Sequence, residues 1–327
     1  MEHLRDLETD IRRELADDSL KYVNDVTGGI VNRAALFRSQ QTGQSFFVKY
    51  NAEEVAKRLF ETERCSLQLL SNTGCVTVPK SVKMFQCSTG QGAVHILEHI
   101  PDLKPLTDFW PEFGQQIGRL HNYNMELLQK EKSQEKSVHS QGDTSGLSPV
   151  NKFGSSFEHF IGTFTPGQVW RDSWQELFVG DIMVPLVTGL VEKYSDRLLQ
   201  EKWAWLQLYL HKVFDQVTIT PAINHGDLCV ANFGQTDKGP VLFDPSVQYA
   251  DSQFDFVLSC MEDKFDDKFF KEYHKIVPRD ARWDQTMLVY ELFYNVVMWY
   301  HINDDKYRTG THSSADRVKQ MLQEKNI

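Results

Sequence analysis

The sequence lacks the residue patterns that mark disulfide-bonded, zinc-binding and membrane-spanning proteins. Its five cysteines are scattered, odd in number and without a CxxC pair, which argues against a disulfide scaffold or a zinc knuckle. The eleven histidines form no HExxH pattern, so a zinc site is not indicated. The longest apolar stretches, near "FYNVVMWY", are too short to span a bilayer, and the charged N-terminus has no apolar signal core. We therefore expect a cytoplasmic protein that does not enter membranes.

A basic excess is also missing. With 35 Lys and Arg against 45 Asp and Glu, the net charge is −10, which disfavours general nucleic-acid binding. A local basic pocket is compatible with this charge, so phosphate-bearing ligands stay open. The 327 residues, 41% of them hydrophobic, suffice for one large domain or two lobes with a substantial core. The composition gives no indication of the oligomeric state.

The first 98 residues predict a small antiparallel sheet with one long helix. Residues 1–20 have the periodicity of an amphipathic helix. Stretches rich in β-forming residues, bounded by glycines and turns, predict five strands, and a helical pattern follows the third of them. The expected strands cover residues 21–29, 34–39, 44–50, 78–87 and 92–100, and the long helix covers residues 52–71. We expect residues 1–98 to form an N-terminal lobe.

Residues 99–327 predict a larger, mainly helical lobe. Residues 129–150 are polar, rich in Ser, Gly and Gln and without an apolar period, which predicts a flexible insertion. Short strands are expected within residues 223–247. The expected helices cover residues 109–129, 172–193, 195–213, 251–275, 284–303 and 313–325. The predicted fold class is therefore α+β, with two lobes of unequal size.

The segment "INHGDLCVANFGQTDKGPVLFDPSV" carries the strongest chemical signal. Asp227 and Asn232 lie five residues apart in a His-x-Asp-x-x-x-x-Asn pattern, and Asp244 follows the apolar strand "GPVLF". This is the spacing of a phosphoryl-transfer loop, which needs a carboxylate beside the acceptor hydroxyl and hard oxygen ligands for Mg²⁺. We expect Asp227 to be the catalytic base, Asn232 and Asp244 to be metal ligands, and His225 to orient the loop.

The alternative reading is that these acidic and amide side chains only cap and bend turns. That reading would suffice for a lone Gly-Asp dipeptide. Here it would have to explain, by coincidence, His225 two positions before Asp227, the apolar strand, and a second aspartate at its end. The combination favours phosphoryl transfer.

The N-terminal lobe offers the cation that such a site requires. Lys49 lies near the end of the strand "FFVKY", and Glu63 follows fourteen residues later in the expected helix. A lysine in this position can reach the α- and β-phosphates of ATP, and a helix carboxylate can pair with the lysine and orient it. A lone strand lysine is usually a surface residue, but the downstream loop favours the functional reading.

Two further stretches are candidates for contacts with ATP. Gly28 and Gly29 lie between the first two strands, where their backbone amides can approach phosphates. A plain hairpin turn explains these two glycines equally well. Glu98 and Ile100 stand at the expected hinge in "LEHI", where main-chain groups would face adenine. This last expectation rests on position in the chain.

The sequence resembles the fructosamine kinases (ketosamine kinases), a group within the aminoglycoside phosphotransferase-like kinases. The likeness runs from about residue 20 to residue 300, and "GPVLFDPSVQYADSQFD" is its most specific part. The other segments that carry it are "FFVKYN", "FETERCSLQLL", "VHILEHI", "IGRLHNYN", "FGSSFEHFIGTF", "WRDSW", "INHGDLCVANF" and "YHKIVPR". The resemblance implies a two-lobed protein-kinase-like fold and ATP-dependent phosphorylation of the 3-hydroxyl of ketosamines, free or protein-bound, in protein deglycation.

The same resemblance implies the roles of the site residues. Lys49 and Glu63 would align ATP, Asp227 would be the base, and Asn232 and Asp244 would bind magnesium. The chain departs from the family pattern where a sugar is expected to lie. Cys229 and Ala231 replace a Trp and a Gly, Val169 replaces an Asn, and residues 249–253 differ from the usual Tyr-Gly-His-x-Glu. The expected substrate-pocket residues are Trp170, Trp174, Cys229 and Asp251.

These departures keep other functions open. The chain could be a kinase of another hydroxyl compound, such as an amino-sugar or a choline-like acceptor, or a catalytically silent nucleotide-binding relative. The complete Lys-Glu-Asp-Asn-Asp set argues against the silent relative, because a scaffold needs no base. A protein kinase is disfavoured because no Ala-Pro-Glu segment or long activation loop follows Asp244.

Overall fold

The computed structural model divides the chain into two compact units. It describes residues 7–27, 32–88, 90–135, 147–215, 218–261 and 265–325. The candidate phosphate-loop residues Gly28 and Gly29 and residues 136–146 of the expected insertion lie outside these ranges. One unit comprises Met1–Phe109 and Ala231–Pro245, and the other comprises Trp110–Val230 and Ser246–Ile327. The functional division into an ATP-binding lobe at 1–98 and a substrate lobe at 99–327 stays a prediction.

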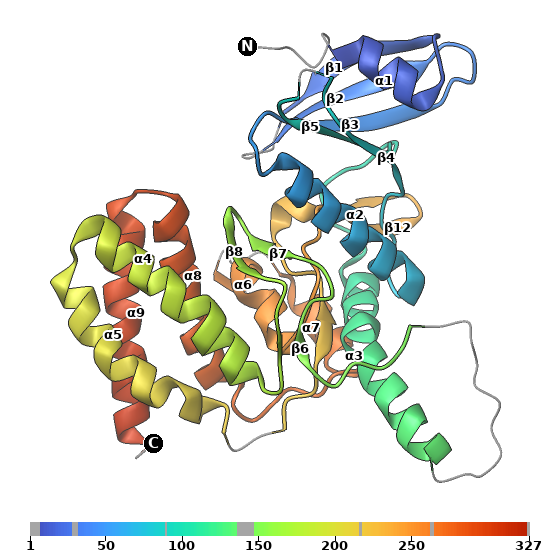
Figure 1. The fold of residues 1–327 in the computed structure, drawn as a ribbon. Helices are drawn as coiled ribbons and strands as arrows, with labels where there is room; N and C mark the ends of the chain where they lie inside the picture. Colours follow the sequence, from blue (N-terminus) through green and yellow to red (C-terminus); the bar gives the residue numbers. More distant parts are fainter. Residues whose placement is uncertain are drawn as a thin grey trace. The chain divides into compact units, whose positions relative to one another are not determined.

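The first unit contains the expected five-stranded sheet and its long helix (Figure 1). All neighbouring strands are antiparallel, in the order β1-β2-β3-β5-β4. The elements are α1 (Glu8–Leu15), β1 (Leu20–Val26), β2 (Arg33–Ser39), β3 (Ser45–Asn51), α2 (Ala56–Thr73), β4 (Ser81–Gln86) and β5 (Ala93–Glu98). The expected helix at 1–20 is shorter, because Ala16 closes α1 in a left-handed conformation.

The two faces of this sheet carry different side chains. Alternate residues of a strand point to opposite faces. Phe46, Val48 and Tyr50 of β3 pack in one apolar cluster with Leu7 and Ile11, next to and within α1. The intervening residues of β3 and β5 therefore face the other side of the sheet. On that side, Phe60 of α2 packs against Ala93.

A hairpin from much later in the sequence completes the first unit. Strands β11 (Phe233–Thr236) and β12 (Gly239–Leu242) pair with each other. The backbone of Leu242 donates to the carbonyl of Thr77 at 2.9 Å, and Lys104 and Gln235 exchange backbone hydrogen bonds at 3.0 and 2.8 Å. These bonds fix the hairpin to the chain that flanks β4 and β5.

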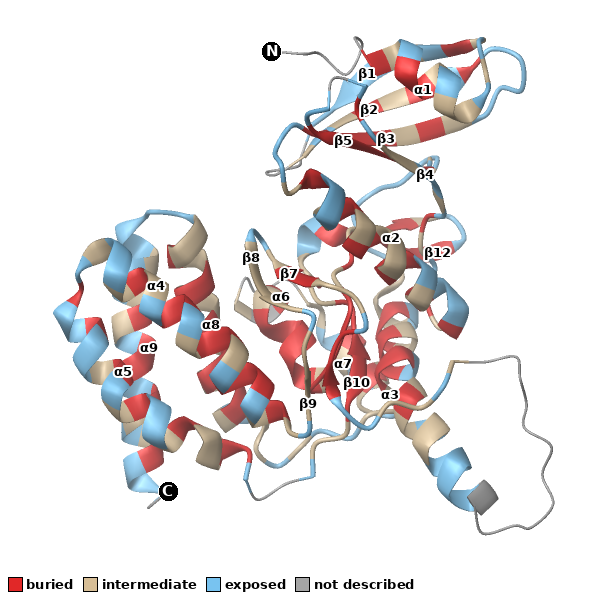
Figure 2. Cartoon of the chain, viewed as in Figure 1, coloured by how far each residue is buried: buried red, intermediate tan, exposed pale blue. Residues whose placement is uncertain are grey.

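The second unit is mainly helical, as expected, and also contains short strands. Its helices are α3 (Trp110–Glu135), the π-helix η2 (Glu176–Met183), α4 (Val184–Tyr194), α5 (Arg197–Tyr209), η3 (Leu210–Val213), η5 (Ser252–Phe256), α6 (Val257–Met261), α7 (Asp267–Tyr273), α8 (Trp283–His301) and α9 (Asp305–Glu324). The short 3₁₀ turn η4 (Val230–Asn232) joins the two units along the chain. The buried residues of α4, α8 and α9, red in Figure 2, belong to one apolar cluster. The same cluster contains Trp174, Phe254 and Tyr290.

Four very short strands between residues 153 and 171 are absent from our sequence predictions. β6 (Phe153–Gly154) and β9 (Trp170–Arg171) join β10 (Ala222–Asn224) and β13 (Gln248–Ala250) in a sheet of order β10-β13-β6-β9. β7 (His159–Ile161) and β8 (Phe164–Gly167) form a separate hairpin. Segments of two to four residues are too short to show an alternating apolar pattern, so their pairing is set by tertiary contacts.

Several expected boundaries are wrong. Helix α3 continues to Glu135, into the segment expected to be a flexible insertion, because Gln, Lys and Glu favour helix even without an apolar period. The expected helix at 172–193 contains a π-helical stretch before Pro185, which has no N–H to donate to the preceding turn. The expected helix at 251–275 is divided, since Asp251 and Asp266 each cap a new helical segment with a side-chain oxygen.

None of the helices in the described ranges combines the length and the apolar character required to cross a membrane.

The contact between α3 and α7 generates a stability prediction. A Cβ atom at Gly114 would lie 2.3 Å from the carbonyl oxygen of Phe269. Gly114→Ala must therefore push the two helices apart, and we expect it to lower the free energy of unfolding by about 2–4 kcal/mol. Urea denaturation measures this loss. Gly180→Ala is the matched control, because nothing lies within 4 Å of its new Cβ, and the control should be neutral or slightly stabilising. Equal stability of the two variants would contradict the packing described here.

Candidate functional site

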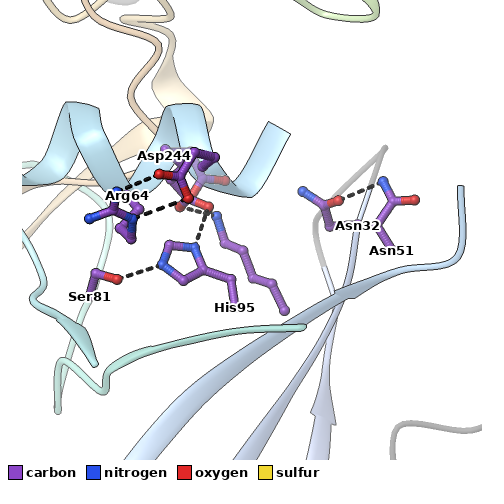
Figure 3. A network of polar contacts seen from close by, with 9 residues as sticks. Asn32, Asn51, Arg64, Ser81, His95 and Asp244 are labelled. Atoms are coloured by element: carbon purple, nitrogen blue, oxygen red, sulfur yellow. Dashed lines mark hydrogen bonds and ion pairs between the residues drawn. The ribbon is translucent and has the colours of Figure 1, made fainter. Parts of the chain in front are cut away.

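Three of the predicted site residues come together in the first unit. The Lys49 ammonium lies 2.6 Å from Oε1 of Glu63 and also contacts Oδ1 of Asp244. The three residues come from β3, α2 and the turn after β12. Figure 3 shows Asp244 and His95 within this network of polar contacts. The structure thus assembles, across 195 positions of sequence, an ion-paired lysine of the kind expected to meet phosphates.

Local structure explains why Glu63 faces Lys49. The buried positions of α2 include the apolar residues Ala56, Phe60, Leu67 and Leu70, and Glu63 lies on the same helical stripe. Glu63 takes one place in this stripe and is thereby directed at the sheet. A carboxylate in such a position is stable only when it is paired, and Lys49 supplies the opposite charge.

Each charge in this network stabilises the other. Burial alone would raise the pKa of Glu63, but the nearby Lys49 and His95 lower it to about 2. Burial alone would lower the pKa of Lys49, but the carboxylates of Glu63 and Asp244 raise it well above its ordinary value. The lysine is therefore a permanent, fixed cation, and removal of either charge would cost about 3–5 kcal/mol.

The turn that carries Asp244 is strained. Asp244 has φ of 56°, a conformation that few residues other than glycine adopt and that costs on the order of 1–3 kcal/mol. It is followed by Pro245, which restricts it further. The Asp244 side chain is 42% exposed, whereas that of Lys49 is 5% exposed. The turn therefore presents a carboxylate that contacts a buried cation and stays accessible from solvent.

Asn232 lies beside this turn. The backbone N–H of Phe243 donates to the carbonyl of Asn232 at 2.9 Å, so Asn232 and Asp244 stand at the same end of the β11–β12 hairpin. A carboxylate and an amide are oxygen donors of the kind that Mg²⁺ prefers, and in phosphoryl-transfer sites the other ligands are phosphates and water. Within the described ranges, no three His, Cys, Asp or Glu side chains gather to hold a metal by themselves. The two residues thus fit a magnesium ion that is held jointly with a nucleotide.

His225 and Asp227 belong to the second unit, where they form a loop after β10. The backbone N–H groups of His225 and Gly226 donate to the two carboxylate oxygens of Asp255, at 2.6 and 2.8 Å. Asp255 is buried and also contacts Nε2 of His121 at 3.2 Å. No role was predicted for Asp255, although it is the last residue of the family-like segment "GPVLFDPSVQYADSQFD". It holds the backbone immediately before Asp227.

A second contact fixes the same loop from the side of β13. The backbone N–H of Ser246 donates to the carbonyl of His225 at 2.9 Å, and the Ser246 hydroxyl lies 3.0 Å from Nδ1 of His159. Gly226 has φ of 85°, and a Cβ atom there would lie 1.7 Å from the Ser246 carbonyl oxygen. Only glycine fits this position. The glycine between His225 and Asp227 in the motif is therefore required for steric reasons.

The residues predicted to line the substrate pocket are distributed over the second unit. Trp174 is buried, and its indole N–H donates to the Tyr290 hydroxyl at 2.8 Å, which in turn donates to Asp251 at 2.8 Å. The register Ala222↔Ala250 and Asn224↔Gln248 puts Asp251 at the opposite end of the β10–β13 ladder from His225. Burial raises the pKa of Asp251. These contacts place Trp174 and Asp251 among the buried residues of the core, where both are hydrogen-bonded to Tyr290.

Trp170 and Cys229 are more accessible. Trp170 is half-buried, with its ring centroid 5.9 Å from that of Tyr249. Cys229 is half-buried and its backbone N–H donates to the carbonyl of Asp227 at 2.9 Å, so it adjoins the expected base. Of the four predicted pocket residues, Cys229 is the one that the structure places directly at the loop.

The expected hinge lies in the first unit. The backbone N–H of Glu98 donates to the carbonyl of Lys80 at 2.8 Å, so the residue before β4 already occupies this group. Ile100 follows β5 and is half-buried. The contact of these residues with adenine stays a prediction.

Comparison with known proteins identifies relatives over nearly the whole chain. The family model described as "Fructosamine kinase" matches residues 6–323. Ketosamine-3-kinase from Mus musculus is 28% identical over 295 residues, which cover 90% of this chain and 94% of that protein. A chloroplastic protein-ribulosamine 3-kinase from Arabidopsis thaliana is 27% identical over 302 residues, which cover 92% of this chain and 83% of that protein.

The fold is also shared with a solved structure. A candidate fructosamine-3-kinase from Haemophilus somnus 129PT aligns with a TM-score of 0.74 at 19% identity, covering 95% of this chain and 96% of that one. At this level of identity the likeness concerns the fold. It confirms the expected α+β, protein-kinase-like fold.

The contacts of Asp255 predict a selective loss of stability. Asp255→Asn replaces one of two acceptor oxygens with an amide that cannot accept from a backbone N–H, so we expect a loss of about 2–4 kcal/mol in the free energy of unfolding. Asp237→Asn is the control, because its side chain is 92% exposed. The control should lose clearly less in the same denaturation experiment. A larger loss for the control would contradict the role assigned to Asp255.

The environment of His159 predicts acid sensitivity. Burial lowers its pKa from 6.5 to about 4, and its Nε2 has no hydrogen-bond partner in the described part of the chain. As the pH falls, His159 is therefore protonated near pH 6.5 in the unfolded chain but only near pH 4 in the folded chain. The contribution of neutral His159 to the free energy of unfolding is fully present above pH 6.5. It falls by up to about 3 kcal/mol as the pH drops to 4.

This effect is measured by denaturation at a series of pH values. His159→Asn keeps a group that can reach Ser246 but cannot titrate, so it should flatten the decline in stability below pH 6.5. His211→Asn is the control, because its side chain is 42% exposed. An unchanged pH dependence in His159→Asn would show that another group causes the decline.

Proposed function

Because this chain belongs to the fructosamine kinase family, whose model spans residues 6–323, we propose that it transfers the γ-phosphoryl group of ATP to the 3-hydroxyl of ketosamines. Curated relatives that cover about nine-tenths of the chain support this acceptor class, since they carry the names ketosamine-3-kinase and protein-ribulosamine 3-kinase. The acceptors would include fructosamines and ribulosamines, both free and attached to proteins. The reaction would serve protein deglycation.

The observation that carries the proposal is the network in which the buried Lys49 ammonium contacts Glu63 and Asp244. Phosphoryl transfer depends mainly on positioning and on electrostatic stabilisation of the phosphate oxygens. Lys49 meets this need because its charge is fixed and its ammonium is held from two sides. Glu63 keeps the ammonium aimed, and the pair would align ATP through contact of Lys49 with its phosphates. Gly28, Gly29, Glu98 and Ile100 are assigned to further contacts with ATP on sequence grounds.

Asp227 is the proposed base. It would accept the proton of the 3-hydroxyl while the oxygen bonds to phosphorus and the bond to ADP breaks. Its loop is anchored through the backbone of His225 and Gly226 to Asp255, which limits the motion of the carboxylate. The order of magnitude expected from such a base is 10²–10⁴ in rate.

Asn232 and Asp244 are the proposed magnesium ligands. When bound, the ion would neutralise negative charge on the phosphates of ATP. The exposed carboxylate of Asp244 is accessible to a cation, and its backbone is fixed by the β11–β12 hairpin. Asp244 and Lys49 already attract each other, so a cation at Asp244 would share this carboxylate with the lysine.

A kinase of an amino-sugar or a choline-like compound is less favoured, because the named relatives act on ketosamines or ribulosamines. A silent nucleotide-binding relative is disfavoured by the retention of Asp227 and of the Lys49 network. The predicted cytoplasmic location and the absence of nucleic-acid partners belong to this proposal, and the oligomeric state is open.

The test is an assay of the purified protein with Mg²⁺ and ATP against fructosyl-lysine, ribulosyl-lysine, choline and an aminoglycoside. We expect ADP formation with the ketosamines only, together with a phosphate on the 3-oxygen by NMR. Asp227→Asn should lower kcat at least about 100-fold, whereas Asp237→Asn, whose side chain is 92% exposed, should leave it unchanged. Omission of Mg²⁺ should stop turnover. Absence of ketosamine-dependent ADP formation, or turnover with choline alone, would overturn the proposal.

A further inference from the structure

His95 is a second ionisable side chain on the sheet face that carries Lys49. The two residues are direct partners across the antiparallel β3–β5 ladder, so their side chains point to the same face and lie side by side. His95 is completely buried. Its ring lies 5.7 Å from the ring of Phe60, which belongs to the same helix as Glu63. Neither the sequence motifs nor the proposed function assigns it a role.

Both ring nitrogens of His95 have polar partners. Nδ1 lies 3.0 Å from Oε2 of Glu63, and Nε2 lies 2.8 Å from the Ser81 hydroxyl. Figure 3 shows His95 between Ser81 and the acidic cluster. Here the ring connects β4 to α2 through β5.

The chemistry of Glu63 determines which nitrogen carries the proton. The carboxylate is ionised, since Lys49 and His95 more than offset the effect of burial on its pKa. An ionised carboxylate can only accept hydrogen bonds, so Nδ1 of His95 must be the donor. In the neutral ring, Nε2 then accepts from the Ser81 hydroxyl. The Ser81 hydroxyl, which can donate as well as accept, is compatible with the tautomer in which His95 donates to Glu63.

The two oxygens of Glu63 are therefore held separately. Oε1 accepts from Lys49 at 2.6 Å and Oε2 accepts from His95 at 3.0 Å. The last torsion of a glutamate side chain is soft and roughly two-fold. With Lys49 as its sole partner, the carboxylate could rotate and carry the ammonium with it. With the second bond to His95, the plane of the carboxylate is fixed.

We propose that His95 is a positioning residue that fixes the Glu63 carboxylate and thereby aims the Lys49 ammonium at the nucleotide phosphates. This inference rests on the proposed function, in which Lys49 and Glu63 align ATP. His95 does not touch ATP itself. Its effect should appear in the interaction with ATP and not in the interaction with the acceptor.

The test compares three variants at one position. His95→Phe keeps the ring but removes both hydrogen bonds. His95→Asn offers an amide at the position of Nδ1 and can still donate to Glu63. His95→Gln offers its amide at the position of Nε2 and can reach only Ser81. We expect the KM for ATP to rise about tenfold to hundredfold in His95→Phe and His95→Gln, with His95→Asn close to wild type. The KM for the ketosamine should change less than twofold in all three.

Met84→Leu is the matched control, because Met84 is the β4 partner of His95 and packs on the same apolar cluster. It should leave the KM for ATP unchanged. Calorimetric titration with ATP, without an acceptor, gives a second readout that does not depend on turnover. If His95→Phe fails to fold, Ser81→Ala takes its place, since it removes the partner of Nε2 and should raise the Kd for ATP at least threefold.

The outcomes separate the two proposals. Absence of ketosamine-dependent turnover in the wild-type protein would refute the proposed function. Wild-type turnover with an unchanged KM for ATP in His95→Phe, or in Ser81→Ala if that variant is used, would refute the role of His95. Equal effects of the Asn and Gln variants would also refute it, because a general packing role does not distinguish the two amide positions.

Discussion

The burial of one ammonium group governs the arrangement of the first unit. The Lys49 side chain is only 5% exposed, and a charge in this setting is tolerable only beside opposite charges. Glu63 and Asp244 meet that condition from a helix and from a hairpin that is distant in sequence. Sheet, helix and hairpin must therefore be assembled correctly before the charge is stable. The same requirement produces a fixed cation next to an accessible carboxylate, which is what phosphate binding and transfer need.

The second unit uses a carboxylate in a different way. Asp255 is paired with backbone amides of His225 and Gly226 instead of with a side-chain cation. Because these amides precede Asp227, the geometry of the loop depends on a residue that takes no part in the chemistry. The two units thus prepare their side chains independently, one by charge pairing and the other by backbone anchoring. In the proposed reaction, both arrangements would limit reorganisation, and such preorganisation is a main source of electrostatic catalysis.

The sequence predicts those features that leave a periodic or spaced signal. Lys49 and Glu63 follow from the order of strand and helix, because their spacing places both on facing elements. His95 could not be identified, because a single histidine in an apolar strand has the pattern of an ordinary core residue. Asp255 was missed because its role depends on a turn in the chain between it and His225. Strands at 153–171 pair through tertiary contacts and are too short for periodicity to show.

The first unit is discontinuous in sequence, and this has an evolutionary consequence. The chain leaves it after Phe109 and returns only for Ala231–Pro245, the segment that brings Asp244 to Lys49. A recombination event that joined residues 1–109 to the remainder of a divergent relative would import a foreign hairpin against a native lysine and helix. A hairpin that packed differently would leave the buried Lys49 ammonium without the Asp244 carboxylate. The two sequence segments of this unit are therefore expected to have been inherited together.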